Sequence, residues 1–195
     1  MSVKDFVQQR RDDFIAMRRD FHMYPEPAWL EYRSASKVAE KLISLGYDVA
    51  LGADVLDLDS RMGLPSEEVM KAAMARAMDE GADPELVEKM GYGKTAIVAT
   101  MKFSDDGPVV AFRADMDSND VIESKASNHI PAKNGFRSRH EKAMHACGHD
   151  THMTMGLGLA EYIATHKDGL KGTIKLIFQP AEEGVRGAKA MVEAG

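Results

Sequence analysis

The segment from Met144 to His152, with the sequence MHACGHDTH, brings the only cysteine of the chain together with three of its seven histidines. Some way downstream, the segment QPAEEG carries two adjacent glutamates, Glu182 and Glu183. Thiolate, imidazole and carboxylate groups are the side chains that hold catalytic divalent metals. A second carboxylate beside a ligand carboxylate provides the proton acceptor that a metal-bound water requires. These residue types in this pattern indicate a metal-dependent hydrolase.

The tripeptide Cys147-Gly148-His149 is the centre of the first segment. In an extended conformation Cys147 and His149 point to the same side, because side chains alternate along a strand, and Gly148 lets the backbone approach an ion. A lone cysteine or histidine is more often a packed core residue than a ligand. Several polar candidates at a turn into a helix nevertheless favour ligands here. The helix predicted to open at Asp150 also stabilises a thiolate, since a helix N-terminus favours negative charge.

Two further pairs of carboxylates follow predicted strands. Glu182 and Glu183 come after an apolar strand at residues 172–178, and ligands commonly lie beyond the carboxyl ends of strands in α/β sheets. Alone, this pair is more typical of a solvated helix start, but the Cys/His cluster favours metal binding. Asp115 and Asp117 end another strand and share one face. They could ligate a metal, orient a ligand histidine or form an ordinary strand-end turn.

The other histidines carry weaker signals. His22 lies at a helix end beside a Tyr-Pro-Glu segment and is more typical of a structural residue. His129, His140 and His166 have no specific signal.

The composition is that of a globular domain. The chain has 195 residues, 44% of them hydrophobic, and a formal net charge of −6, so no basic stripe is available for nucleic-acid binding. A single cysteine excludes an internal disulfide and fits a reducing compartment. The N-terminus does not resemble a signal peptide, and no stretch approaches the roughly 18 apolar residues of a membrane span. We therefore expect a cytoplasmic protein that binds neither nucleic acid nor membranes.

Hydrophobic periodicity predicts the elements that position these groups. Helices are expected at residues 3–22, 34–45, 66–80, 84–90, 150–163 and 187–194, and strands at 47–51, 95–101, 108–113 and 172–178. The turn SDDG at residues 104–107 predicts a hairpin between the second and third strands. Residues 118–143 are expected to form a long loop, a kind of segment that is commonly functional. The order of elements predicts an α/β sandwich with a mixed sheet.

Residues from about 52 to 92 break the α/β rhythm and are interpreted as a helical insertion. Met70, Met74 and Met78 recur within it at a spacing of four residues. This stripe is predicted to be a packing surface rather than a ligand site, because methionine mostly fills apolar gaps.

Three segments resemble a known family. FRADMD, MHACGHDTHM and LIFQPAEEGVRGAKAMVEAG are similar to motifs of the aminoacylase and carboxypeptidase family of two-metal metallopeptidases, in its amidohydrolase branch. The resemblance covers nearly the whole chain. It implies a three-layer α/β sandwich with a mixed, mostly parallel sheet, as in the catalytic domain of zinc peptidases.

The resemblance also implies roles for single residues. Cys147, His149 and Glu183 match the metal ligands of the family, and Glu182 matches its general base, which takes a proton from water and returns it to the leaving amine. Two divalent ions, Mn²⁺ or Zn²⁺, are expected in a complete site; thiolate suits zinc and carboxylate suits manganese, so the ligand types leave the metal open. The implied reaction cleaves the amide bond of a small N-acyl amino acid, with p-aminobenzoyl-glutamate as the expected substrate.

The chain departs from the family in its length. Family members are longer, with two further metal-binding histidines downstream and an inserted dimerisation domain. Residues 1–195 are therefore expected to be the N-terminal part of a catalytic domain, with little activity alone, that works as a homodimer or as a heterodimer with a related chain. The alternative is a catalytically inactive fragment that serves as a binding or assembly module. A structural zinc module is disfavoured because only three ligands are evident.

Overall fold

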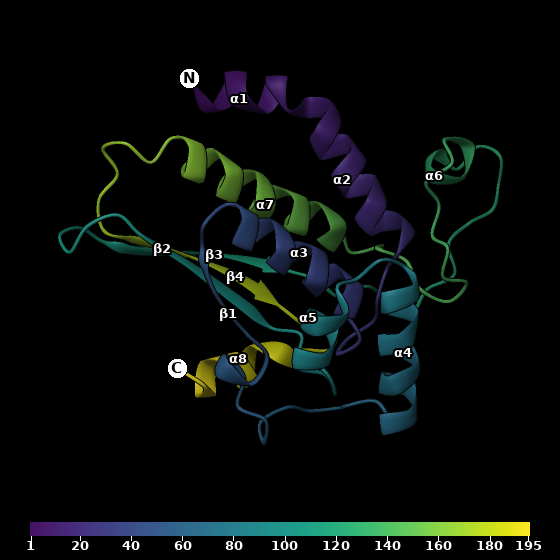
Figure 1. Ribbon diagram of the computed structural model, residues 1–195. Coiled ribbons are helices and arrows are strands. Elements are labelled where there is room, and N and C mark those ends of the chain that lie inside the picture. The colour runs from purple at the N-terminus through teal and green to yellow at the C-terminus, as the bar shows by residue number, and fades with distance from the viewer.

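A computed structural model describes residues 1–195 and shows a four-stranded sheet (Figure 1). The strands are β1 (Asp48–Leu51), β2 (Ile97–Lys102), β3 (Val109–Asp115) and β4 (Thr173–Gln179), in the order β1-β2-β4-β3. β1 pairs antiparallel with β2, and β2 pairs antiparallel with β4. Only β3 and β4 are parallel neighbours. All four strands lie close to their predicted positions.

The expectation of a mostly parallel sheet was wrong, since two of the three strand pairings are antiparallel. Apolar runs in the sequence report burial but not strand direction. Parallel neighbours need a long crossover connection, usually a helix. β3 and β4 have one, because α7 (His149–Thr165) lies between them in the chain. The sheet is therefore mixed, as the order of elements predicted.

The predicted hairpin between β2 and β3 was also wrong, because β4 lies between these strands. Their short connection passes around the start of β4: the N–H groups of Phe103 and Ser104 both donate to the carbonyl oxygen of Gly172, at 2.9 and 3.4 Å. A Cβ atom on Gly107 would lie 2.7 Å from the backbone nitrogen of Gly172. Both glycines have positive φ, so the close crossing depends on residues without a side chain.

The helices largely follow the predicted positions. They are α1 (Val3–Gln9), α2 (Arg11–Met23), α3 (Tyr32–Ser44), α4 (Glu67–Asp79), α5 (Pro84–Lys89), α6 (Ile130–Lys133), α7 and α8 (Gly187–Glu193), with a 3₁₀ turn at Gly52–Asp54. The helix predicted for residues 3–22 is divided at Arg10. The predicted loop at residues 118–143 contains only the short α6. No helix in the structure combines the length and apolar character needed to cross a bilayer.

The hydrophobic core lies on one face of the sheet, between the strands and the helices α3 and α7. Leu176 and Phe178 of β4 point into it and are buried. Met70 and Met74 of α4 are buried in the same core and Met78 packs against it, which confirms the packing role predicted for the methionine stripe. α2 packs on the outside of α7 (Figure 1). On the opposite face of the sheet only α8 packs, so the third layer of the expected sandwich consists of one short helix.

Candidate metal centre

The site begins where the two parallel strands end. In the register of β3 and β4, Asp115 pairs with Gln179, so the segments that follow the two strands start side by side. The Met116 N–H donates to the Gln179 carbonyl oxygen at 3.0 Å and continues the pairing beyond the strands. The crossover helix α7 packs against β3 and β4 and begins at His149. This topology brings together three segments that are far apart in the sequence.

Three of the predicted site residues meet at this point. Ligand atoms of Cys147, His149 and Glu183 all lie within 4.8 Å of one another. His149 is 4% exposed, whereas Cys147 and Glu183 are partly exposed. A thiol, an imidazole and a carboxylate at this spacing form a donor set that suits Zn²⁺, and the carboxylate also suits Mn²⁺.

A backbone carbonyl group fixes the tautomer of His149. Its Nδ1 lies 2.8 Å from the carbonyl oxygen of Asp117, an atom that can only accept a hydrogen bond. Nδ1 therefore carries the proton, and Nε2 keeps the lone pair that a metal would bind. This orientation by a neighbouring backbone group is typical of ligand histidines.

The carboxylate of Asp117 holds the glutamate pair. Its Oδ1 accepts the Glu182 N–H at 3.0 Å, and its Oδ2 accepts the Glu183 N–H at 2.9 Å. Asp117 is fully buried. Of the alternatives left open for this residue, the geometry favours the orienting role over an ordinary turn, because its carbonyl positions His149 and its carboxylate positions the glutamates.

Glu182 lies beside the donor group. Its Oε2 is 3.6 Å from Nε2 of His149, and its side chain is 39% exposed. A carboxylate next to the donors and open to solvent has the position that a proton acceptor for an attacking water needs.

A second group of donor atoms shares His149. Asp115, His149 and His152 also have ligand atoms within 4.8 Å of one another. Because Nδ1 of His149 is engaged, only one ion can take its Nε2. Asp115 already lies 3.1 Å from Arg113, which competes with a metal for its carboxylate. The cysteine-containing group is therefore the better candidate. Sequence reasoning did not single out His152, which lies one helical turn after His149.

The electrostatics at the site favour a cation. Burial alone would lower the pKa of His149, but the hydrogen bonds with Asp117 and Cys147 and the negative charge of the thiolate raise it to about 11. The same negative surroundings stabilise a divalent ion. Nearby, His145 is 3% exposed and its ring nitrogens have no hydrogen-bond partner; burial lowers its pKa to about 4. These observations fit a metal centre.

Gly148 differs from its predicted conformation. Its φ is 90°, in the left-handed region, so the segment from Cys147 to His149 is not extended. A Cβ at this position would meet nothing within 4 Å. The glycine is therefore required for the backbone turn that starts α7, rather than for lack of bulk.

His22 lies behind the site, in a buried hydrogen-bond network. Its Nδ1 is 2.8 Å from Asp150, the residue after His149, and its Nε2 is 3.0 Å from Glu123 in the long loop. His129 and the Ser138 N–H also bond to Glu123. This position agrees with the structural role predicted for His22 and anchors the loop at residues 118–143.

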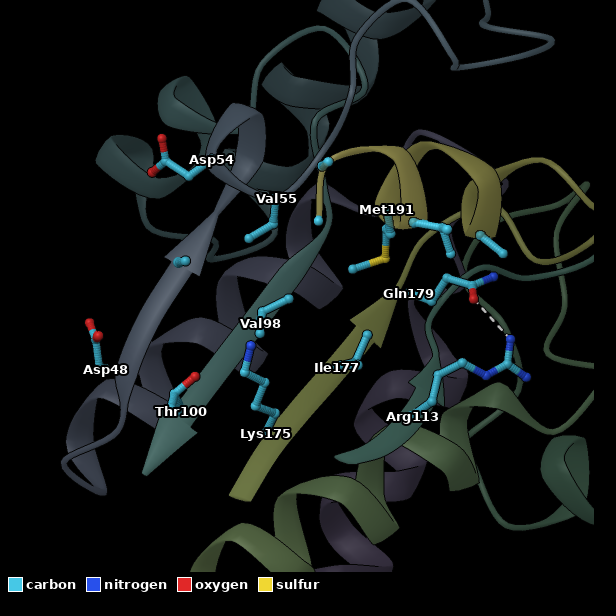
Figure 2. A pocket seen from close by; sticks show the side chains of 15 residues that line it. Asp48, Asp54, Val55, Val98, Thr100, Arg113, Lys175, Ile177, Gln179 and Met191 are labelled. Atoms are coloured by element: carbon cyan, nitrogen blue, oxygen red, sulfur yellow. Dashed lines mark hydrogen bonds between the residues drawn. The ribbon is translucent and has the colours of Figure 1, made fainter. Parts of the chain in front are cut away.

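The largest cavity, of about 620 Å³, lies elsewhere. It opens on the face of the sheet that only α8 partly covers, where Val98, Ile177 and Met191 form an apolar floor (Figure 2). Arg113 donates to Gln179 at its edge, at 2.9 Å. None of the candidate ligands lines this cavity, so its size does not make it the reaction site.

Comparison with known proteins identifies the family. A family model described as peptidase family M20/M25/M40 matches residues 111–195, the part of the chain that contains the whole donor group. The indole-3-acetyl-aspartic acid hydrolase of Enterobacter agglomerans is 48% identical over 99% of this chain. One of the subunits of the p-aminobenzoyl-glutamate hydrolase of Escherichia coli is also 48% identical, over 100% of it. The chain belongs to the M20/M25/M40 peptidase family.

Solved M20 structures share the fold. The crystal structure of an aminobenzoyl-glutamate utilization protein from Klebsiella pneumoniae covers 100% of this chain with a TM-score of 0.83 and 42% identity. A Bacillus subtilis protein described as a dinuclear metal binding peptidase of the M20 family covers 98% with a TM-score of 0.67 and 28% identity. The chain spans 43% and 40% of these two structures and 44% of each of the two curated relatives.

Proposed function

We propose that this chain carries part of the active site of a metal-dependent amidohydrolase that cleaves the amide bond of N-acyl amino acids. The observation that supports it best is the meeting of Cys147, His149 and Glu183 beyond the parallel strands, with Glu182 next to them. The family adds support, because one M20 structure is described as a dinuclear metal binding peptidase.

In this proposal Cys147, His149 and Glu183 hold one of two divalent ions, Zn²⁺ or Mn²⁺. When bound, such an ion acts as a Lewis acid and lowers the pKa of water. Glu182 acts as the general base: its carboxylate takes a proton from the attacking water and delivers it to the nitrogen of the leaving amine. Asp117 keeps the imidazole and both glutamates in place through the hydrogen bonds described above.

The names of the relatives suggest the substrate class. Indole-3-acetyl-aspartic acid and p-aminobenzoyl-glutamate are both amides that join an aromatic carboxylic acid to an acidic amino acid. We propose p-aminobenzoyl-glutamate as the substrate, with p-aminobenzoate and glutamate as products. Since the two hydrolases are equally similar to this chain, indole-3-acetyl-aspartate is the natural comparison in any assay.

A second function is a catalytically inactive binding or assembly module. It is favoured by the partial coverage of the relatives, because more than half of each relative lies outside the matched region. One relative is named as part of a multi-chain enzyme, so a second copy or a related chain is the proposed partner.

Metal content and hydrolysis of both substrates test the two functions together. They are measured on residues 1–195 and, where the coding sequence continues, on the extended chain. Two ions per extended chain with hydrolysis, and fewer ions on residues 1–195, support the amidohydrolase. Absence of metal in both forms overturns it and leaves the assembly role.

Two substitutions separate the proposed roles. Glu182→Gln should lower kcat by about 10²- to 10⁴-fold and leave the metal content unchanged, because it removes a base but no ligand. Cys147→Ala should lower the metal content, measured by elemental analysis. His152→Ala is the matched control and should keep its metal. Equal metal loss in the Cys147 and His152 variants would contradict the choice of donor group.

A further inference from the structure

Glu31 is a fully buried carboxylate at the start of α3, distant in sequence from the metal centre. Its Oε1 accepts the Trp29 N–H at 3.0 Å and the Ala181 N–H at 2.8 Å. Its Oε2 lies 2.7 Å from the hydroxyl group of Thr95, which is also fully buried. Neutral donors thus surround the carboxylate, and no cationic side chain pairs with it.

The contact with Ala181 reaches the metal centre directly, because this residue precedes Glu182 and Glu183. Ala181 has a φ of 51°, a left-handed conformation that is costly for a residue with a side chain and persists only where its surroundings impose it. Its carbonyl oxygen accepts the N–H groups of Arg186 and Gly187, at 3.1 and 2.9 Å. The bond to Glu31 holds the N–H group of the same residue.

Glu31 and Asp117 therefore act on one short stretch of backbone. Asp117 accepts the N–H groups of Glu182 and Glu183, and Glu31 accepts the N–H group of the residue before them. Three consecutive backbone donors thus end on two buried carboxylates from two other segments of the chain.

The protonation of Glu31 is compatible with this role. Burial, and then the negative charge of Asp117, raise the pKa of Glu31 to about 8. A protonated Glu31 can donate from Oε2 to the Thr95 oxygen while Oε1 still accepts both N–H groups. A glutamine has the same arrangement of one acceptor oxygen and one donor. The acceptor at Oε1, and not the negative charge, is what the Ala181 N–H needs.

We propose that Glu31 is a positioning residue for the glutamate pair: by accepting the Ala181 N–H it holds residues 181–183 against Asp117, so that Glu182 and Glu183 stay beside His149. The proposal rests on the proposed function for its catalytic meaning. Its structural content, the ordering of residues 181–183 by Glu31, stands on the contacts alone.

The test compares three substitutions of Glu31 with a matched control. Glu31→Ala removes the acceptor, Glu31→Gln retains it, and Glu31→Asp keeps the charge but withdraws it from Ala181. Glu26→Ala is the control: Glu26 is equally buried, but its carboxylate accepts the N–H groups of Arg33 and Ser34 at the start of α3. Hydrogen exchange of the 179–187 segment, Zn²⁺ affinity and thermal stability are measured on the whole chain.

Glu31→Ala and Glu31→Asp should speed amide exchange at residues 181–183 and weaken Zn²⁺ binding by about 10- to 100-fold. Glu31→Gln should restore both to the wild-type level. Glu26→Ala should lower the thermal stability without a selective change at residues 181–183. The Asp variant keeps the test informative if the Ala variant does not fold.

Unchanged exchange and affinity in Glu31→Asp, or a Glu31→Gln variant as impaired as Glu31→Asp, would overturn the proposal. If the wild-type chain binds no metal, the proposed function fails. The exchange pattern then still decides the positioning role, so the two failures are distinguishable.

Discussion

Asp117 positions ligands through two different groups, its carbonyl and its carboxylate. The carbonyl selects the tautomer of His149, and the carboxylate orders the backbone of Glu182 and Glu183. Groups that support metal ligands in this way commonly matter almost as much as the ligands.

Asp117→Asn should weaken Zn²⁺ binding by about 10- to 100-fold. The amide group keeps one acceptor oxygen but places an NH₂ group against the N–H of Glu182 or Glu183, and a buried donor left without an acceptor costs about 1–3 kcal/mol. Zn²⁺ affinity is measured by competition with a chromophoric chelator. Asp115→Asn is the control, because Asp115 does not hold the glutamate backbone. Equal affinities of the two variants would contradict the role of Asp117.

At the scale of elements, the start of α7 depends on the left-handed conformation of Gly148. Gly148→Ala should lower the free energy of unfolding by about 1–2 kcal/mol, because the cost is one of backbone conformation and not of contact. It should also weaken metal binding, because it disturbs the turn between Cys147 and His149. Chemical denaturation and metal titration measure the two effects.

Gly135 offers a matched control for this substitution. It has a φ of 74°, and a Cβ there would also meet nothing within 4 Å, but it lies in the long loop. Gly135→Ala should lose similar stability and keep its metal affinity. A loss of affinity in both variants would show that general destabilisation, and not the local turn, controls metal binding.

His22 joins three elements, since it bonds from α2 to Asp150 of α7 and to Glu123 of the long loop. Burial opposes its charged form, but the hydrogen bonds to Asp150 and Glu123 outweigh burial and raise its pKa above 6.5. A raised folded-state pKa contributes stability that is fully present below the unfolded-state pKa and is lost as the pH rises through the folded-state value.

The free-energy difference between wild type and His22→Leu should therefore be largest near pH 6, at about 1–3 kcal/mol, and shrink as the pH rises. Urea denaturation over this pH range measures it. Arg18→Met is the control: Arg18 pairs with the same Asp150 carboxylate at 2.9 Å, but its charge does not change in this range. A difference for His22→Leu that does not vary with pH would contradict the argument.

For the whole molecule, the two faces of the sheet are unequal. Leu176 faces the core under α3 and α7, whereas its neighbour Ile177 faces the cavity on the more open side (Figure 2). Leu176→Ala should cost about 2–5 kcal/mol in unfolding free energy. Ile177→Ala should cost about 1 kcal/mol, because a half-buried side chain loses only part of its transfer free energy. Equal costs, measured by chemical denaturation, would mean that both faces are equally packed.

The sequence predicted those features that local patterns encode. The donors Cys147, His149 and Glu183 stood out by type and spacing, and every strand was near its place because apolar runs report burial. Strand direction and neighbours depend on long-range pairing, so β4 was not expected between β2 and β3. The role of Glu31 had no local signal at all, because its partner Ala181 lies 150 residues away. The weighing of Asp117 included the right alternative without a means to choose it.

The insertion of β4 between β2 and β3 sets the order of events during synthesis. A ribosome releases β2 and β3 well before β4, and until residue 179 has emerged each lacks its shared neighbour and exposes an unpaired edge. The same late strand carries the loop with Glu182 and Glu183. The metal donors therefore come together only after the last strand has entered the sheet, and ion capture follows completion of this fold instead of nucleating it.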